Sequence, residues 1–264
     1  MSTHAAPHDG VLVERDGDVV TVWMNRPDRR NALSLEQMRA LRRAFADAGD
    51  SEALGVVLGG RGPVFSAGHD FADLAGADLE AARTLLGTCT ELMDTMQHIP
   101  QVVIARVHAL ATAAGCQLVA TCDLAVAVDT AGFAAPGGKA GWFCTTPMVA
   151  IGRNVSRKQA LEIALTGDVF SAETALAWGF VNRVVPADEL DLAVADLLGR
   201  ATRGSPASKA LGKRAFYTQI GMDQPQAYAY AVEVMAAASQ TPDAQEGVAS
   251  FLEKRKPQWG AADH

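Results

Sequence analysis

The sequence predicts an α/β protein, in which a body of alternating strands and helices is followed by a helical C-terminal region. Short valine-rich runs alternate with helical patterns through the first half, whereas helical patterns dominate from about Ser156. Of the 264 residues, 49% are hydrophobic and 20% are charged, a composition that buries a sizeable core. We therefore expect a flexible N-terminus at residues 1–10, a core at 11–200 and a helical region at 201–264.

The body begins with a hairpin. Valine-rich runs at residues 11–15 and 18–24 flank Asp16-Gly17, a dipeptide typical of tight hairpin turns. Ser34 to Gln37 has the pattern of a capping box, and the helix that follows is expected to end near Gly49. The next elements expected are strands at 55–58, 102–105 and 124–128, and helices at 78–96 and 111–121.

The second half is expected to be mainly helical, with Ser171 as one N-cap. The expected helices lie at 156–166, 171–178, 188–202, 205–219, 224–239 and 242–254, and one strand lies at 181–185.

The net charge of −7 excludes an extended nucleic-acid-binding face, so an anionic small ligand must be held by local positive clusters. Residues 1–10 contain neither the apolar run of a signal peptide nor the arginines of a transit peptide. Arg106 and Asp123 interrupt the most apolar stretch, 102–128, so no membrane span is expected. We therefore expect a cytoplasmic protein.

The four cysteines are spaced neither as a disulfide framework nor as a metal site. Cys89, Cys116, Cys122 and Cys144 form no C-x-x-C pair and have no close histidine partners. Buried thiols in a reducing compartment are the simplest interpretation, and no metal site is predicted.

Three loops contain residues that can support chemistry. In the first, residues 65–70, successive backbone N–H groups can face an anion or can simply form an ordinary strand-to-helix turn. Ser66 and His69 in this loop also suggest a serine hydrolase, although no G-x-S-x-G motif occurs in the sequence.

The second loop, residues 108–117, leads from a strand into a helix through small residues. A helix N-terminus offers unpaired N–H donors to an oxyanion, although small residues also suit close helix packing. We interpret His108 as a structural histidine in preference to a general base. The third loop, residues 133–147, is glycine-rich, and no aspartate or glutamate occurs between Asp129 and Glu162.

These loops, with residues 24–27 (Met-Asn-Arg-Pro) and 30–34 (Arg-Asn-Ala-Leu-Ser), resemble the enoyl-CoA hydratase/isomerase (crotonase) superfamily. The closest branch is that of the enoyl-CoA hydratase domain-containing proteins, which share the stretches 110–120 and 143–147. The resemblance implies a crotonase-like spiral of ββα units with C-terminal helices that form a homotrimer or a dimer of trimers. It also implies an acyl-CoA substrate, and no cofactor apart from the coenzyme A of that substrate.

The resemblance also implies which residues bind the thioester. The backbone N–H groups of His69 and Ala114 match the oxyanion hole that holds the thioester carbonyl. The two catalytic glutamates of the family's hydratases match Gln117 and Gly137. A glutamine can orient a water but has no proton to exchange near neutral pH, and a glycine can do neither. Proton transfer by a positioned group is worth ~10²–10⁴ in rate, so we expect at most weak hydratase activity.

For the coenzyme A portion, the resemblance matches Arg30 with a phosphate contact and Ala67 with the backbone beside the adenine. Phe251 and Lys254 match residues that reach the coenzyme A of a neighbouring subunit.

Asp70, Cys144 and Thr145 complete the predicted substrate site. Asp70 is expected to hold its own loop in place, and Thr145 occupies the position of the aspartate in the superfamily's dehalogenases. Cys144 is a nucleophile only if its pKa is lowered. Three functions therefore remain open: an acyl-CoA enzyme that stabilises a thioester enolate, a non-catalytic acyl-CoA-binding oligomer, and a hydrolase that uses Ser66 or Cys144.

Overall fold

The computed structural model describes residues 3–4 and 10–260, so most of the N-terminus predicted to be flexible lies outside the described residues. The main sheet has seven strands in the order β1-β2-β3-β4-β5-β7-β10. These strands are β1 (Thr3–His4), β2 (Val11–Asp16), β3 (Val19–Met24), β4 (Gly55–Gly60), β5 (Val102–Val107), β7 (Leu124–Val128) and β10 (Arg183–Val185).

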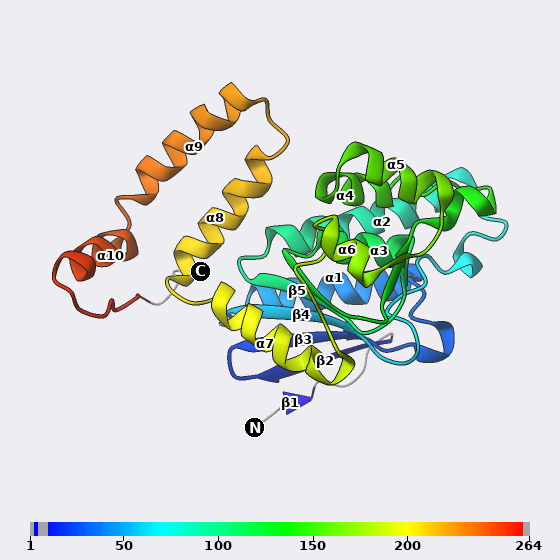
Figure 1. The fold of residues 1–264 in the computed structure, drawn as a ribbon, viewed down its shortest axis with the longest axis horizontal. Helices are drawn as coiled ribbons and strands as arrows, with labels where there is room; N and C mark the ends of the chain where they lie inside the picture. Colours follow the sequence, from blue (N-terminus) through cyan, green and yellow to red (C-terminus); the bar gives the residue numbers. More distant parts are fainter. Residues whose placement is uncertain (1–2, 5–9, 261–264) are drawn as a thin grey trace.

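The predicted hairpin is confirmed, because β2 and β3 pair antiparallel, with Asp16 opposite Val19. From β3 onward every neighbouring pair is parallel. All six residues of β4 are buried, as expected of a parallel strand that is covered on both faces. Figure 1 shows α1 (Leu35–Gly49) and α2 (Leu79–His98) on one side of this sheet and α7 (Leu190–Ala201) on the other.

A second, three-stranded sheet lies beside the first and positions the helix that faces the site. It consists of β6 (Ala111–Thr112), β8 (Gly132–Ala134) and β9 (Phe170–Ser171) in the order β6-β8-β9. Directly after β6 comes α3 (Ala114–Thr121), all of whose residues are buried. The remaining elements of the body are α4 (Pro147–Asn154), α5 (Arg157–Thr166), α6 (Ala172–Ala177) and the short 3-10 helices η1 (Pro27–Arg29), η2 (Phe71–Asp73), η3 (Pro136–Ala140) and η4 (Ala187–Glu189).

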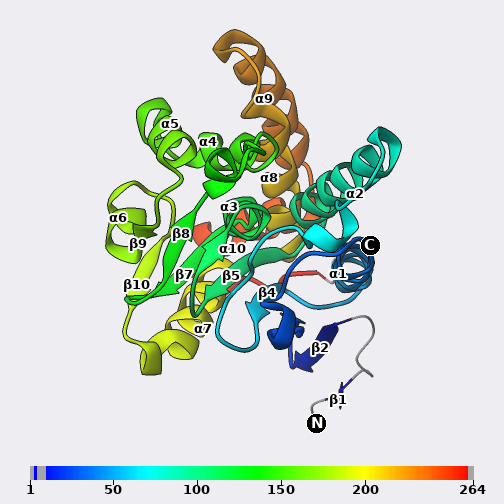
Figure 2. The same cartoon turned by 90° about the vertical axis from the view of Figure 1, so that its right-hand side faces the viewer.

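The C-terminal region is helical, as predicted. It contains α8 (Pro206–Gln219), α9 (Gln224–Ala238) and α10 (Pro242–Leu252), and Figures 1 and 2 show these helices leaving the body as an arm. Within the described single chain, α8 and α9 contain no buried residue. Large apolar side chains on this arm are therefore exposed, among them Val232 and Met235 at 60% and 78%.

Three expectations for the local structure need correction. The helix predicted at 111–121 begins only at Ala114, because Ala111 and Thr112 pair with β8. Strands β8 and β9 and helix α4 were not predicted at all. At Ser34 only half of the capping box forms: the serine accepts from the Gln37 N–H, whereas the Gln37 amide donates to the Gly10 carbonyl.

Candidate active site

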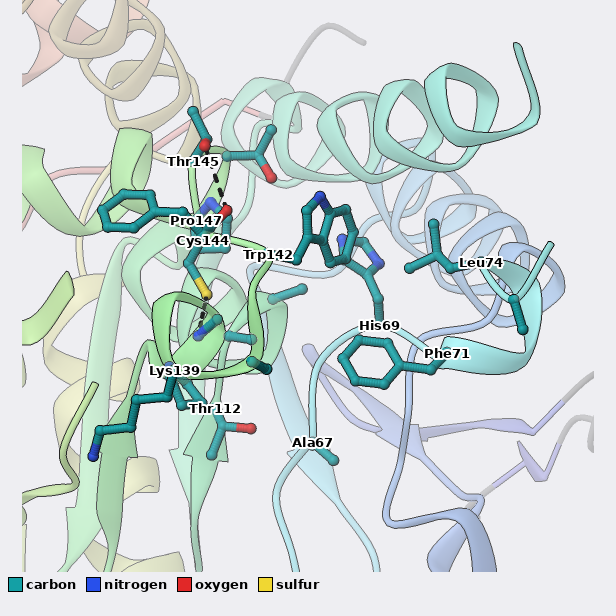
Figure 3. Close-up of a pocket in the computed structure, with 18 residues that line it drawn as sticks. Ala67, His69, Phe71, Leu74, Thr112, Lys139, Trp142, Cys144, Thr145 and Pro147 are labelled. Carbon is teal, nitrogen blue, oxygen red and sulfur yellow. Dashed lines mark hydrogen bonds between the residues drawn. The ribbon is translucent and has the colours of Figure 1, made fainter. Parts of the chain in front are cut away.

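A cavity of about 780 Å³ lies where the first and third loops meet the N-terminus of α3 (Figure 3). It is mostly apolar, and no aspartate or glutamate is present among the described residues that line it. The lining residues are Ala67, His69, Phe71, Leu74, Ala75, Thr112, Ala113, Ala114, Pro136, Gly137, Lys139, Ala140, Trp142, Phe143, Cys144, Thr145, Thr146 and Pro147.

The backbone around His69 leaves one N–H free to face this cavity. The Leu33 N–H donates to the Gly68 carbonyl (2.7 Å), and the Asp70 N–H donates to the Leu33 carbonyl (3.1 Å). In such a parallel bridge, Leu33 bonds to backbone atoms of the residues before and after His69. The N–H of His69 itself therefore points away from Leu33. This N–H donates to no acceptor in the described parts of the chain.

A second free donor comes from Ala114, the first residue of α3. An N–H in the first turn of a helix has no acceptor within that helix. The preceding Ala113 has φ 50° and ψ −119°, a strained backbone held by its own hydrogen bond to the Ala134 carbonyl (2.9 Å). The two donor segments are in contact, because a Cβ at Gly68 would lie only 3.2 Å from the Ala114 nitrogen.

Asn31 fixes the first loop, a role that sequence reasoning missed. Its buried side-chain amide donates to the carbonyls of Arg61, Val64 and Phe65, and its Oδ1 accepts from the Arg26 N–H. The Asn31 carbonyl in turn accepts from the hydroxyl of Ser66 (2.8 Å). An asparagine in a turn is common in any sequence, so this network had no local signal.

The hydrolase alternative that uses Ser66 is not supported by this arrangement. The Ser66 hydroxyl is fully buried and already donates to a backbone carbonyl, and neither ring nitrogen of His69 has a hydrogen-bond partner among the described residues. His108 also has a structural contact, as predicted: its Nε2 lies 2.8 Å from the Gly62 carbonyl.

Asp70 holds its own loop, as predicted, and does not line the cavity. Its carboxylate binds Arg29 (3.1 Å) and Arg26 (3.5 Å) and caps η2 by accepting from the Ala72 N–H. The structure also brings Arg30 beside the first loop, because its carbonyl accepts from the Ala67 N–H (3.0 Å). The side chain of Arg30 is exposed.

The His69 imidazole lies inside the cavity, close to Trp142 of the third loop. The two ring centroids are 6.1 Å apart, and Figure 3 shows Phe71 on the same side. Burial lowers the pKa of the His69 ring below its ordinary value. Both ring nitrogens are buried without a partner in the described chain.

Cys144 and Thr145 line the opposite side of the cavity (Figure 3). The Cys144 sulfur accepts from the Gly137 N–H (3.3 Å), and burial raises the pKa of the thiol. A raised pKa removes the thiolate that a nucleophile needs, so Cys144 does not meet the condition for a hydrolase. Thr145 is exposed, and its hydroxyl contacts the Phe143 carbonyl (3.4 Å).

Two predicted site residues do not join the cavity within one chain. Gln117 is buried on α3, where its Oε1 lies 3.9 Å from the sulfur of Cys89, and it is not among the lining residues. Phe251 is 83% exposed on α10, and Lys254 follows the end of that helix. The arm therefore presents this pair to solvent, away from the cavity of its own chain.

A profile of the family described as enoyl-CoA hydratase/isomerase matches residues 14–262. The chain belongs to the enoyl-CoA hydratase/isomerase family. Among its relatives, rat enoyl-CoA hydratase domain-containing protein 3, mitochondrial, is 42% identical over 93% of this chain and 82% of its own. A putative enoyl-CoA hydratase of Thermus thermophilus is 32% identical over 94% of this chain and 100% of its own.

Solved structures of the enoyl-CoA hydratase/isomerase family confirm the predicted fold. An enoyl-CoA hydratase from Mycobacterium smegmatis superposes with a TM-score of 0.92 at 45% identity, over 96% of this chain and 99% of that one. Human enoyl-CoA hydratase domain-containing protein 3 superposes with a TM-score of 0.90 at 38% identity, over 95% and 100%.

The comparison contradicts the expected cytoplasmic location. The similar rat, zebrafish and human members of the enoyl-CoA hydratase/isomerase family are all named as mitochondrial. The expectation rested on the composition of residues 1–10, on the interrupted apolar stretch 102–128 and on cysteines interpreted as reduced thiols, which the structure shows to be free and buried. Free thiols indicate a reducing compartment and do not distinguish one such compartment from another.

Among the described helices, none is long and apolar enough to cross a membrane. The described residues also contain no group of three or more histidine, cysteine, aspartate or glutamate side chains able to hold a metal ion.

Proposed function

We propose that this family member binds an acyl-CoA thioester and stabilises an enolate of it in an oxyanion hole formed by the His69 and Ala114 N–H groups. The observation that carries this proposal is the meeting of two backbone donors, neither with an acceptor in the described chain, at the wall of one apolar cavity. Donors that are already aimed at a developing oxyanion are worth ~10²–10³ each in rate.

The proposed reaction does not use the two-carboxylate chemistry of hydratases. Gly137 leaves no room for a side chain, because a Cβ there would lie 2.1 Å from the Trp142 carbonyl oxygen. Gln117 is packed against Cys89 behind the cavity wall. The absence of a carboxylate from the described lining also favours a second candidate function, acyl-CoA binding without turnover.

Arg30 is the proposed contact for the coenzyme A phosphates. Arg26 and Arg29 are engaged by Asp70, whereas the Arg30 side chain is exposed beside the Ala67 backbone. Phe251 and Lys254 are proposed to complete the site of a neighbouring copy in a homotrimer or a dimer of trimers. The exposed apolar side chains of the arm support this assembly, since large exposed apolar patches mark interaction surfaces.

The test uses crotonyl-CoA. We expect the wild-type protein to bind it and to shift its conjugated thioester absorbance to longer wavelength, because two N–H donors polarise the carbonyl. We expect hydration, followed as loss of that absorbance, to be weak for lack of the two glutamates. Binding with neither a spectral shift nor any reaction would support the non-catalytic alternative.

Ala114→Pro tests the oxyanion hole directly. Proline is tolerated at the first position of a helix, and it replaces the N–H by a ring carbon that cannot donate. We therefore expect the spectral shift to be lost and any turnover to fall ~100-fold. Arg157→Pro, at the exposed first position of α5, is the matched control and should change neither. An unchanged shift in folded Ala114→Pro protein would contradict the assignment.

A further inference from the structure

The His69 imidazole is a buried polar group that the described chain leaves without hydrogen bonds. Neither Nδ1 nor Nε2 has a partner, and the ring lines the cavity of the proposed thioester site. Buried polar atoms are nearly always hydrogen-bonded, and each exception in a native structure needs a physical reason. Both nitrogens are shielded from solvent in the unliganded chain, so a ligand in the cavity would provide the missing partner once the ring turns toward it.

The backbone that bears this ring is held by Leu33. Leu33 binds the backbone on both sides of His69, at 2.7 Å and 3.1 Å. The ring packs against Trp142 with an interplanar angle of 44°. Since the N–H of the same residue is proposed to hold the thioester oxygen, the α-carbon of the bound acyl group would lie in the cavity that the imidazole lines.

The other ionisable side chains of the cavity wall are engaged elsewhere. Lys139 forms an ion pair with Asp168, and the Cys144 sulfur accepts from the Gly137 N–H. The nearby Leu33 backbone and, from η2, the Asp73 carboxylate both oppose the effect of burial on the pKa of His69. Asp73 also accepts from the Leu35 N–H (2.7 Å).

The net effect of these groups on His69 is set by burial, which lowers the pKa of the ring. Asp70, the next residue in the chain, is neutralised by Arg29 and Arg26. The imidazole is therefore neutral near pH 7, and one of its nitrogens has a lone pair available to accept a proton.

We propose that the His69 imidazole is the proton-transfer group of this site. Its unprotonated nitrogen takes a proton from the α-carbon of the bound acyl thioester, and the C–H electron pair moves to form the enolate, whose oxygen is held by the two N–H donors. The imidazolium exchanges this proton with water and then returns a solvent-derived proton to the same carbon. The net reaction exchanges an α-hydrogen with solvent and needs no co-reactant. This inference rests on the function proposed above.

The experiment measures deuterium uptake at the α-carbon of butyryl-CoA in D₂O by mass spectrometry, and butyryl-CoA binding in parallel. We expect uptake by the wild-type protein and a ~100-fold slower rate in His69→Gln, with the Kd changed less than about threefold. His98→Gln is the control: His98 is exposed on α2, where its Nδ1 contacts the Asp94 carbonyl, and its replacement should not affect exchange.

The pH profile provides a readout that a purely structural role of His69 would not change. Because the neutral ring is the base, the exchange rate should rise with pH and level off, with a midpoint below the ordinary histidine value of 6.5. This inflection should disappear in His69→Gln. If that variant does not fold, the wild-type profile alone decides, and a flat profile overturns the proposal.

The outcomes separate this inference from the proposed function. Wild-type protein that binds butyryl-CoA without α-exchange overturns the role of His69 and leaves acyl-CoA binding intact. Equal exchange in His69→Gln and wild type does the same. Wild-type protein that does not bind butyryl-CoA overturns both proposals.

Discussion

The described chain places polar atoms inside the protein in two different ways. At the junction between the arm and the body, Asp123 accepts from Tyr217 (2.7 Å), from Lys213 (2.8 Å) and from the Val103 N–H (2.7 Å), and Lys213 also donates to two backbone carbonyls. We refer to Asp123, Lys213 and Tyr217 as the Asp123 anchor. In the cavity, by contrast, the His69 ring has no partner.

The difference shows where the hydrogen-bonding capacity of polar side chains is satisfied within the chain and where it is left for a ligand. In the Asp123 anchor, burial lowers the pKa of Lys213 while the Asp123 carboxylate opposes that shift, so each charge compensates the other. Such a cluster fixes α8 on the body and has no free capacity for a substrate. An unpartnered ring in a cavity costs free energy until something binds it.

The largest effect that tests this comparison is expected for Asp123→Ala. The substitution leaves a largely buried ammonium and a half-buried hydroxyl without their acceptor, and removing one partner of such an ion pair costs about 3 kcal/mol. Urea unfolding measures this loss. The matched control is Asp47→Ala, an exposed aspartate on α1. Equal stability of the two variants would show that the anchor contributes nothing.

A smaller effect is expected for Gly137→Ala, which tests how tightly the third loop is packed. The added Cβ would lie 2.1 Å from the Trp142 carbonyl oxygen and 2.8 Å from the Cys144 sulfur, so the loop must shift at a cost of about 1–3 kcal/mol. In Gly138→Ala, one residue further in η3, the new atom would lie no closer than 3.4 Å to its neighbours. The unfolding temperature of Gly137→Ala should therefore be lower than that of Gly138→Ala.

The result for Gly137 also decides whether a hydratase can be rebuilt here. The sequence alone suggests that Gln117→Glu with Gly137→Glu restores the two glutamates. The structure removes that expectation, because one position has no space and the other faces Cys89 instead of the cavity. A double variant that folds and hydrates crotonyl-CoA rapidly would show that the loop moves more readily than its contacts indicate.

Local signals were enough to predict the hairpin and most helices. The Asp16-Gly17 turn and the serine caps at Ser34 and Ser171 act within a few residues, so the sequence contains them directly. The start of α3 was missed because it depends on the pairing of β6 with β8, about twenty residues later. Helix α4 was missed because its first residue, Pro147, was assigned to the preceding glycine-rich loop.

The candidate site also has parts that local sequence signals predict and parts that depend on long-range contacts. The resemblance to the enoyl-CoA hydratase/isomerase family identified the loops that contain His69 and Ala114. The structure brings those two residues to one cavity. It does not bring Gln117 there, and no pattern in the sequence shows that the third loop closes over Gly137. The lack of a partner for the His69 ring likewise depends on tertiary structure, because distant segments of the chain place no hydrogen-bonding atom next to its nitrogens.

The smallest effect on stability, and the sharpest contrast with the Asp123 anchor, is expected for His69→Leu. Replacing a buried polar side chain that has no partner by an apolar one of similar size removes an unsatisfied group, so the free energy of unfolding should stay the same or rise by about 1 kcal/mol. Urea unfolding and α-exchange of butyryl-CoA are measured on the same preparation. We expect unchanged or higher stability with exchange abolished. A loss of stability as large as that of Asp123→Ala would mean that the ring supports the fold. The distinction between the Asp123 anchor and the His69 ring would then not hold.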